Sequence, residues 1–332
     1  MKKSMDKTRK YVYGIVGSAN EESFGCIGIG NSEVCVVRYE DIGTAVSDVP
    51  ESFKIDIEEA GVHEKALQKI METHTVIPIG FGVVAKDETE IRDVLKRARK
   101  RFQHILKNID HKVQINVKIS WNKAILVSIL EENEEIRTLS RETKENNAQS
   151  LRIELGRKVK SALDRKKNEY MENIEIALKS LADGFKEGKI LDQDTLMSAS
   201  FLVDKRREQE FNARLEELER KYKGNLEFKS ISPLPPYNFI NIEMKRIDFK
   251  AIEEAQRTLD LGEEISISEV NSAYNLLARE CHPDLHPDDS LAEEKFEKLN
   301  NAHELLIKYC AHYLCSLEKS KVEETLLIEE KG

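Results

Sequence analysis

The sequence predicts an α+β protein, made of two mixed domains and a small all-α module near the C-terminal end. Three observations support this class. Short apolar runs typical of strands alternate with longer segments of helical period as far as residue 248. From residue 249 to 315 only helical periodicity remains. Acidic charge is concentrated there too, because residues 251–315 hold about 14 acids and 5 bases, in a chain whose net charge is −9.

The first domain is expected to span residues 1–121. Its strands are predicted at residues 11–16, 34–39, 44–46 and 113–119. A helix begins after Asp87, which can cap it, and carries apolar residues at helical spacing as far as Leu106. Several strands with two helices favour a ferredoxin-like arrangement.

Inside this domain, a helix over residues 62–73 runs directly into an apolar strand over residues 75–84. The strand is apolar almost throughout, so both of its faces are expected to be covered. Pro78 donates no ladder hydrogen bond and therefore predicts an edge, a bulge or an irregular start. Gly80 and Gly82 are expected to let another backbone approach closely.

The second domain is expected to span residues 122–248. Helices are predicted over residues 123–142, 147–183 and 204–221. Strands are predicted over residues 196–203 and 226–231. The helix at 147–183 is so polar that it should contact a second helix, or bridge domains, through a narrow apolar seam. Three prolines within residues 232–239 predict a stiff, extended connection.

Four segments follow one another across residues 11–245. They are Tyr11-Val-Tyr-Gly-Ile-Val16, the His63 helix with Val76-Ile-Pro-Ile-Gly-Phe-Gly82, Leu196-Met-Ser-Ala-Ser-Phe-Leu-Val203 and Ser232-Pro-Leu-Pro-Pro-Tyr-Asn-Phe239. In this order they resemble the motifs of the GvpF/GvpL family of gas vesicle accessory proteins. Ser232 stands where the family pattern has Gly, so the turn there is expected to be tighter or differently shaped. The resemblance implies a two-domain α+β protein needed to build the gas vesicle shell. It also implies contact with the small hydrophobic shell protein and with other accessory proteins.

Residues 249–315 carry three predicted helices. The first covers residues 251–259, and either Ser266 or Ser268 can cap the second. The third has apolar residues at helical spacing from Ala292 onward. We therefore expect a small helical bundle.

The tripeptide His282-Pro283-Asp284 lies in the loop between the second and third of these helices. A tripeptide of this kind between two such helices resembles a J domain, the module that stimulates ATP hydrolysis by DnaK-type chaperones. The resemblance implies that His282, Pro283 and Asp284 contact the chaperone. Pro283 ends the helix and stiffens the loop, and Asp284 is placed to meet a cation of a partner. Tyr274 and Phe296 are expected to hold the two helices together.

The charge of this module departs from the J-domain pattern, in which the second helix is basic. Here the second helix has Arg279 against Glu269 and Glu280, and Leu285 follows the tripeptide where a base is usual. Electrostatic attraction of an acidic chaperone face is therefore weak or reversed. The second copy of the tripeptide, at residues 286–289, is interpreted as loop and not as a further site.

No catalytic, cofactor or metal site is predicted. Residues 25–30 contain three glycines but fit no phosphate-binding motif, so they are interpreted as a turn. The histidines of the first domain lack the spacing of metal ligands; they are His63, His74, His104 and His111. No domain is strongly basic, which argues against nucleic acid as a partner.

The remaining features predict a cytoplasmic protein. The five cysteines are odd in number and lack a C-x-x-C pair, which predicts thiols in a reducing compartment and no disulfide framework. They are Cys26, Cys35, Cys281, Cys310 and Cys315. No signal peptide and no membrane span are expected. Residues 316–332 are predicted to be a charged, frayed tail.

These patterns lead to one main hypothesis and two alternatives. The main hypothesis is a cytoplasmic gas vesicle accessory protein that binds shell and accessory proteins and recruits a DnaK-type chaperone through its J-like module. The first alternative is a minor structural component of the vesicle wall, whose J-like module is only a docking surface. The second is an enzyme, which no motif supports.

Overall fold

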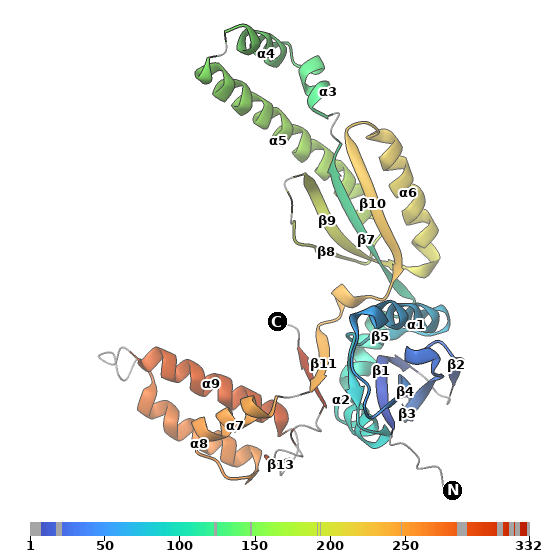
Figure 1. Ribbon diagram of the computed structural model, residues 1–332, viewed down its shortest axis with the longest axis vertical. Helices are drawn as coiled ribbons and strands as arrows, with labels where there is room; N and C mark the ends of the chain where they lie inside the picture. The colour runs from blue at the N-terminus through green and yellow to red at the C-terminus, as the bar shows by residue number, and fades with distance from the viewer. Residues whose placement is uncertain are drawn as a thin grey trace. The chain divides into compact units, whose positions relative to one another are not determined.

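The computed structural model describes residues 8–17, 22–122, 125–146, 148–190, 192, 194–246, 248–283, 291–310, 315–318, 322 and 326–330 (Figure 1). The chain forms two compact units. The first comprises Met1–Lys107 together with Asn241–Gly332, and the second comprises Asn108–Ile240. The α+β class is confirmed, since both units combine a sheet with helices and a helical module occupies part of the first.

The N-terminal part of the first unit is a six-stranded antiparallel sheet with two helices. The strands have the order β2-β3-β4-β1-β5, and β6 pairs with β1 beyond β5 along the same edge. Their bounds are β1 Thr8–Gly17, β2 Ser23–Gly25, β3 Val34–Tyr39, β4 Ile42–Pro50, β5 Val76–Pro78 and β6 Val84–Ala85. The helices are α1 Ala60–Thr73 and α2 Glu88–Asn108, with short 3-10 turns at Ile29–Asn31 and Ile57–Glu59. Asp87 caps α2 as predicted, because its carboxylate accepts the backbone N–H of Glu90 at 3.0 Å.

The apolar strand expected over residues 75–84 is divided into β5 and β6. Both pieces pair with β1, and the chain between them leaves the sheet through a turn that needs the positive φ of Gly82, +94°. Pro78 lies at an edge of the sheet, as its missing N–H requires. The close backbone approach occurs at Gly14 of β1 instead, where an added Cβ would lie 2.8 Å from the carbonyl oxygen of Ile77.

The second unit contains the ferredoxin-like arrangement that was expected in residues 11–121. Its elements run strand, helices, strand, strand, helix, strand, and the sheet order is β10-β7-β9-β8. The strands are β7 Lys112–Trp121, β8 Gly184–Glu187, β9 Thr195–Asp204 and β10 Leu226–Leu234. The helices are α3 Ile125–Glu132, α4 Glu134–Asn146, α5 Gln149–Lys179 and α6 Glu208–Lys221. The predicted strand at 113–119 is thus β7, at the centre of this sheet and not part of the first one.

The long helix α5 has two different partners along its length. Near its start, Val159 and Ala162 join Ile136 of α4 in a small apolar cluster. Near its end, Ile174 and Leu178 are fully buried in the unit, where α5 contacts β9 and α6. The expected contact with another helix through a narrow apolar seam is therefore present at the start of the helix.

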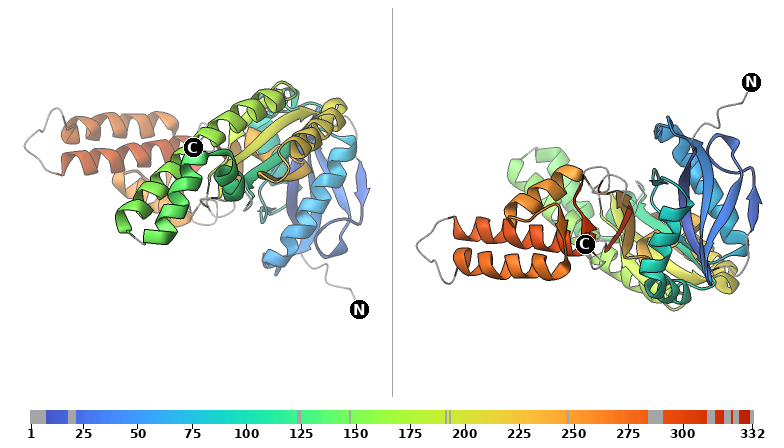
Figure 2. Two further views of the ribbon diagram at one scale, coloured as in Figure 1. Left: turned by 90° about the horizontal axis from the view of Figure 1, so that it is seen from above. Right: turned by 90° about the horizontal axis from the view of Figure 1, so that it is seen from below.

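The C-terminal part of the first unit is the helical module. It consists of α7 Phe249–Thr258, α8 Ile267–Cys281 and α9 Ala292–Tyr309, with the short strands β12 Glu264–Ile265 and β13 Cys315–Ser316 paired. Helices α8 and α9 lie side by side (Figures 1 and 2). The core is aliphatic apart from Tyr309 and Cys310, and its aliphatic members on the three helices are Ile252, Ala255, Val270, Leu299, Ala302 and Leu306. Ser266, and not Ser268, caps α8, in a capping box with Glu269.

Two expectations about the C-terminal end need correction. Residues 326–330, predicted to be part of a frayed tail, form strand β14, Leu326–Glu330, which pairs antiparallel with β11, Ile242–Arg246. Leu326 is buried, and this burial together with the strand pairing holds the segment in place. Cys310 and Cys315 form a disulfide, whereas thiols without disulfides were expected; Cys26, Cys35 and Cys281 are free.

Candidate functional site

The predicted chaperone-contacting motif begins where α8 ends. His282 is the C-cap residue and has an extended backbone, with φ −65° and ψ 127°, so the chain turns away from the helix axis at this point. Pro283 follows and lacks the N–H that would continue the helix. The ring centroid of His282 lies 4.8 Å from that of Phe296 on α9. The third residue of the motif, Asp284, lies outside the described residues.

Polar and aromatic contacts fix the position of α8 on α9. The hydroxyl of Tyr274 donates to Oδ1 of Asn300 at 2.7 Å. The ring of Tyr274 also packs at 4.2 Å from that of His303, whose Nε2 is hydrogen-bonded to Oδ1 of Asn271 at 2.8 Å. Burial lowers the pKa of His303, so the neutral imidazole is favoured. These contacts set the point on α9 at which α8 ends, and therefore where His282 lies.

The outer face of α8 is nearly neutral. Arg279 is its one base, and Glu269 and Glu280 are its acids. Glu269 is already engaged at the N-terminus, where the N–H and hydroxyl of Ser266 lower the pKa of its carboxyl. Leu276 is 63% exposed on this face. The face therefore offers an apolar side chain and neutral polar groups to a partner, with little net charge to steer one.

The helix-and-strand motif around His63 forms a buried hydrogen-bond network. His63 is 2% exposed and joins α1 to the chain between β5 and β6. Its Nε2 donates to the carbonyl oxygen of Ile79 at 3.1 Å, and its Nδ1 accepts from the hydroxyl of Tyr11 at 3.0 Å. The same hydroxyl accepts the N–H of Gly82 at 3.0 Å. One network thus ties together the helix, the first strand and the glycine turn.

This network requires a neutral histidine. A carbonyl oxygen can only accept, so the proton of His63 is on Nε2, and Nδ1 is left as an acceptor for Tyr11. Burial lowers the pKa of His63 to about 4. Burial also raises the pKa of the Tyr11 hydroxyl, which keeps it a donor. His63 therefore has a structural role, and none of its contacts is that of a metal ligand.

The proline-rich motif of the second unit ends in a comparable network. Asn238 donates its backbone N–H to Oε1 of Gln114 on β7 at 2.8 Å, and its side-chain amide to the hydroxyl of Ser200 on β9 at 2.6 Å. Ser200 in turn donates to Asn116 at 2.7 Å. Gln114 and Ser200 are buried. Residues 237–239 are fastened to the centre of the sheet by these bonds, which is a structural role for the motif.

Other kinds of site receive no support from the part of the chain that the structure describes. It contains no group of three or more His, Cys, Asp or Glu side chains arranged to hold a metal ion. Among the described helices, none combines the length and apolar character needed to cross a lipid bilayer. Of the predicted site residues, the described ones, His282 and Pro283, lie together at the end of α8.

Comparison with known proteins shows to which family the residues carrying these motifs belong. The family model described as gas vesicle synthesis protein GvpL/GvpF matches residues 9–241, which include the His63 and Asn238 networks. The chain belongs to the GvpL/GvpF family. Gas vesicle protein F of Streptomyces sp. (strain CB03234) is 28% identical over 236 residues, covering 69% of this chain and 98% of that protein. Gas vesicle protein F1 of Halobacterium salinarum is 26% identical and covers 70% of this chain and 93% of its own.

Solved structures of GvpF share the fold of the same region. The crystal structure of GvpF from Anabaena sp. PCC7120 has a TM-score of 0.60 at 22% identity, covering 70% of this chain and 98% of that one. The crystal structure of GvpF from Microcystis aeruginosa has a TM-score of 0.55 at 21% identity, with the same coverage. The two α+β parts of this chain therefore have the GvpF fold.

The helical module matches a different family. A model described as DnaJ domain covers residues 254–309. Chaperone protein DnaJ of Prosthecochloris aestuarii is 46% identical over 48 residues, which is 14% of this chain and 12% of that protein. This chain is thus a GvpL/GvpF-family protein that carries a J domain at its C-terminal end.

Sequence analysis missed one charged surface. Five of the six residues from Lys96 to Arg101 on α2 are basic, but averaging charge over whole domains hid this run. A count over windows of six residues would have found it. Strand β14 lies beside this basic run, and the sequence did not predict that strand.

Proposed function

We propose that this chain is an accessory protein of gas vesicle assembly that recruits a DnaK-type chaperone to the proteins it binds. The two α+β parts would bind the gas vesicle shell protein and other accessory proteins in the cytoplasm. The J domain would contact the chaperone through His282, Pro283 and Asp284. The observation that carries the proposal is a J domain in one chain with a GvpL/GvpF body, with His282 held at the end of α8.

Tethering supplies the mechanism. A client bound to the α+β body and a chaperone bound to the J domain share one chain, so the second binding event becomes intramolecular and its effective concentration rises. The J domain needs no binding site for the client itself. What it must supply is a rigid contact for the chaperone, and the α8–α9 contacts at Tyr274 provide that rigidity.

The neutral outer face of α8 has a kinetic consequence for this mechanism. Long-range attraction of an acidic chaperone face would be small, so association would depend on short-range contacts. We expect the interaction with a chaperone to change little with salt concentration, in contrast to one steered by a basic helix.

A structural role in the vesicle wall is the second candidate. The specific observation in its favour is that α8 presents the exposed Leu276 among neutral polar residues and lacks a basic face. Such a surface suits docking to another protein as well as it suits a chaperone. In that case the protein would remain with purified vesicles after a urea wash.

The chain offers a matched pair of variants for the test. His282→Gln alters the motif at the end of α8, and His286→Gln makes the same change in the second tripeptide, four residues further along the sequence. Full-length wild type and both variants are used as bait in vesicle-forming cells, and their partners are identified by mass spectrometry. We expect vesicle proteins with all three baits, and a DnaK-type chaperone with wild type and His286→Gln only.

Two outcomes contradict parts of the proposal. Vesicle proteins without a chaperone on any bait would favour the wall component. Equal chaperone recovery with His282→Gln would show that the tripeptide is not the contact. Point variants are preferable to deleting residues 249–332, because the deletion also removes β14 and uncovers β11.

A further inference from the structure

A strongly basic face lies on α2, in the part of the chain that has the GvpF fold. Lys96, Arg97, Arg99, Lys100 and Arg101 fall within six consecutive residues of one helix. The chain as a whole has a net charge of −9. Like charges this close on one helix repel one another, and this repulsion destabilises the helix unless other groups neutralise the charges.

Part of this charge is neutralised inside the unit. Arg99 pairs with Glu40 at 2.5 Å and with Asp41 at 2.8 Å, and these bonds fasten α2 to the turn between β3 and β4. Lys96 and Lys100 are exposed, and neither pairs with a carboxylate among the described residues. Two cations of α2 therefore remain available to a partner.

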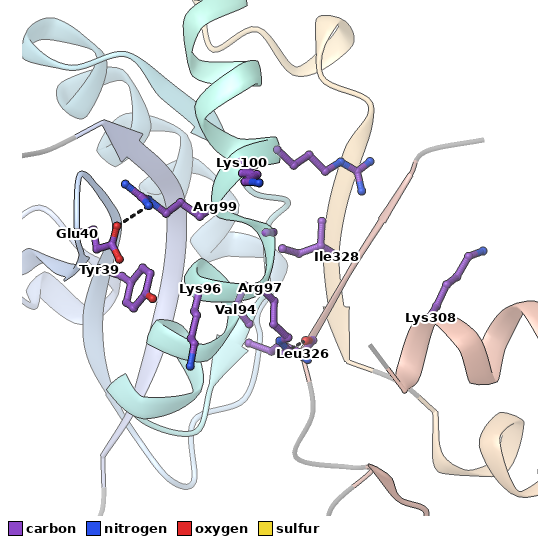
Figure 3. Close-up of a pocket in the computed structure, with 12 residues that line it drawn as sticks. Tyr39, Glu40, Val94, Lys96, Arg97, Arg99, Lys100, Lys308, Leu326 and Ile328 are labelled. Carbon is purple, nitrogen blue, oxygen red and sulfur yellow. Dashed lines mark hydrogen bonds and ion pairs between the residues drawn. The ribbon is translucent and has the colours of Figure 1, made fainter. Parts of the chain in front are cut away.

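These lysines border a cleft of about 550 Å³ (Figure 3). Its walls are α2, the turn at Tyr39 and strand β14, and Lys308 of α9 also lines it. The apolar side chains that line it are those of Val94, Ala98, Leu326 and Ile328. The volume is in the range of sites that hold a ligand. A cleft with an apolar lining and a cationic border suits a ligand that is both apolar and anionic.

Strand β14 shows what kind of segment this surface accepts. Its sequence is Leu-Leu-Ile-Glu-Glu. The N–H of Leu326 donates to Oε1 of Glu90 at 3.1 Å, and its carbonyl accepts from Arg97 at 3.2 Å. Glu329 pairs with Lys245 of β11 at 2.6 Å. Two side chains of α2 thus bind the backbone of an extended, apolar and acidic segment, much as a neighbouring strand would.

Further along β14, other backbone groups also point away from β11 and toward the cleft. Because the N–H of Leu326 is used by Glu90, Leu326 and its partner Arg246 are a pair without ladder hydrogen bonds, and the outward groups of β14 recur every second residue. The backbone N–H and C=O of Ile328 therefore also point away from β11. Ile328 lines the cleft, so these groups offer a second extended segment the hydrogen bonds of a strand edge.

We propose that this cleft binds an extended segment of a partner protein in which apolar and acidic side chains alternate. The apolar side chains of the bound segment lie on the half-buried Ala98 and Ile328, and its carboxylates meet Lys96 and Lys100. A peptide fits better than a nucleic acid, because alternating backbone donors and acceptors match a strand edge, and phosphates only accept. The proposal does not depend on chaperone recruitment.

The test uses the full-length chain and a synthetic peptide of alternating Leu and Glu, labelled with fluorescein and followed by fluorescence anisotropy. Lys96→Glu with Lys100→Glu reverses the two free charges, and Lys65→Glu with Lys160→Glu makes the same change at exposed lysines elsewhere. We expect the first pair to weaken binding at least about tenfold and the second pair to leave it within about twofold. Lys96→Gln with Lys100→Gln should give an intermediate loss.

Two further probes decide the class of ligand. A peptide of the same composition with its Leu and Glu residues in separate blocks should bind clearly more weakly, because its side chains no longer alternate. A single-stranded DNA of equal charge should also bind more weakly. No binding of the alternating peptide, equal binding by the DNA, or an unchanged affinity in the Lys96 and Lys100 variant would overturn the proposal. Unchanged circular dichroism of each variant shows that it has folded.

Discussion

The α+β body and the helical module specify their structures in different ways. The buried polar residues among those described all lie in the body: Thr44, Ser47, His63, Gln114, Thr195 and Ser200. The described core of the module contains only apolar side chains and the tyrosine and cysteine at its end, and its polar contacts, such as Tyr274 with Asn300, are half-exposed. The body thus depends on hydrogen bonds inside its core, and the module depends on apolar burial.

This difference has an energetic meaning. A buried donor or acceptor that loses its partner costs about 1–3 kcal/mol, whereas a half-exposed group can bond to water instead. A core network also permits only the arrangement in which all its members are satisfied. The body should therefore be sensitive to small chemical changes that the module tolerates.

The largest effect is expected from His63→Leu. The substitution leaves the hydroxyl of Tyr11 and the carbonyl of Ile79 without their partner inside the core, so we expect a loss of about 3 kcal/mol in the free energy of unfolding of the first sheet. His303→Leu in the module should cost less than about 1 kcal/mol. Amide hydrogen exchange, measured separately for β1 and for α8, gives both values. Equal losses in the two variants would contradict the comparison.

Acid should act mainly on the body through the same residue. The pKa of His63 is about 4 in the folded chain and about 6.5 when unfolded, so its contribution is complete above pH 6.5 and is lost as the pH falls to about 4. The loss is up to about 3 kcal/mol. Burial raises the pKa of Glu90, which acts in the opposite direction. Denaturant unfolding of wild type and His63→Leu at each pH isolates the contribution of His63, as the difference between their free energies of unfolding. A difference that stays constant from pH 7 to 4 would refute the predicted pH dependence.

Removing single hydroxyl groups tests the same difference between the α+β body and the helical module with a smaller change. Tyr11→Phe leaves Nδ1 of His63 unpaired in the core and removes the acceptor of the half-buried N–H of Gly82, and should cost about 2 kcal/mol. Tyr274→Phe loses a hydrogen bond that water can replace, and should cost about 0.5 kcal/mol. Hydrogen exchange of β1 and α9 reads the two costs independently. A larger cost for Tyr274→Phe would mean that the α8–α9 contact is more protected than its exposure indicates.

The smallest effect concerns the start of α8. Ser266 accepts the N–H of Glu269 in a capping box, so Ser266→Ala should destabilise the module by about 1 kcal/mol. Ser268→Ala is the matched control and should change stability by only a few tenths of a kcal/mol, since Ser268 is not the cap. Thermal unfolding followed by circular dichroism would show the ranking. The reverse ranking would place the N-cap at Ser268.

Local patterns predicted individual elements well. The strand expected at residues 34–39 is β3, and the helix expected to end at about Lys221 is α6. Both segments have a clear period of apolar residues and a turn or cap at their ends. The helices of the module were predicted from the same two signals, an apolar period and a turn or cap at each end. The position of His282 and Pro283 directly after α8 was predicted in the same way. The chaperone-contacting role of His282, Pro283 and Asp284 stays a prediction.

Strand partners and short polar segments could not be predicted in this way. The apolar period of β7 gives its faces but not its neighbours, so nothing local indicated that it pairs with β9 and β10 in the second sheet. Strand β14 is five residues long and is held by β11, Glu90 and Arg97, all distant in sequence. The core networks were missed because hydrogen bonding between distant residues leaves no periodic signal.

The pairing of β11 with β14 brings together the two ends of the segment that contains the J domain. Arg246 of β11 and Leu326 of β14 lie opposite each other in the two-stranded sheet. The chain therefore enters the helical module and leaves it at neighbouring points. A domain attached by two adjacent ends can be exchanged for another with a similar spacing of its termini, without altering the fold that receives it. The β11–β14 pair, which follows the residues matched by the GvpL/GvpF model, is therefore a point at which a different domain could replace the J domain.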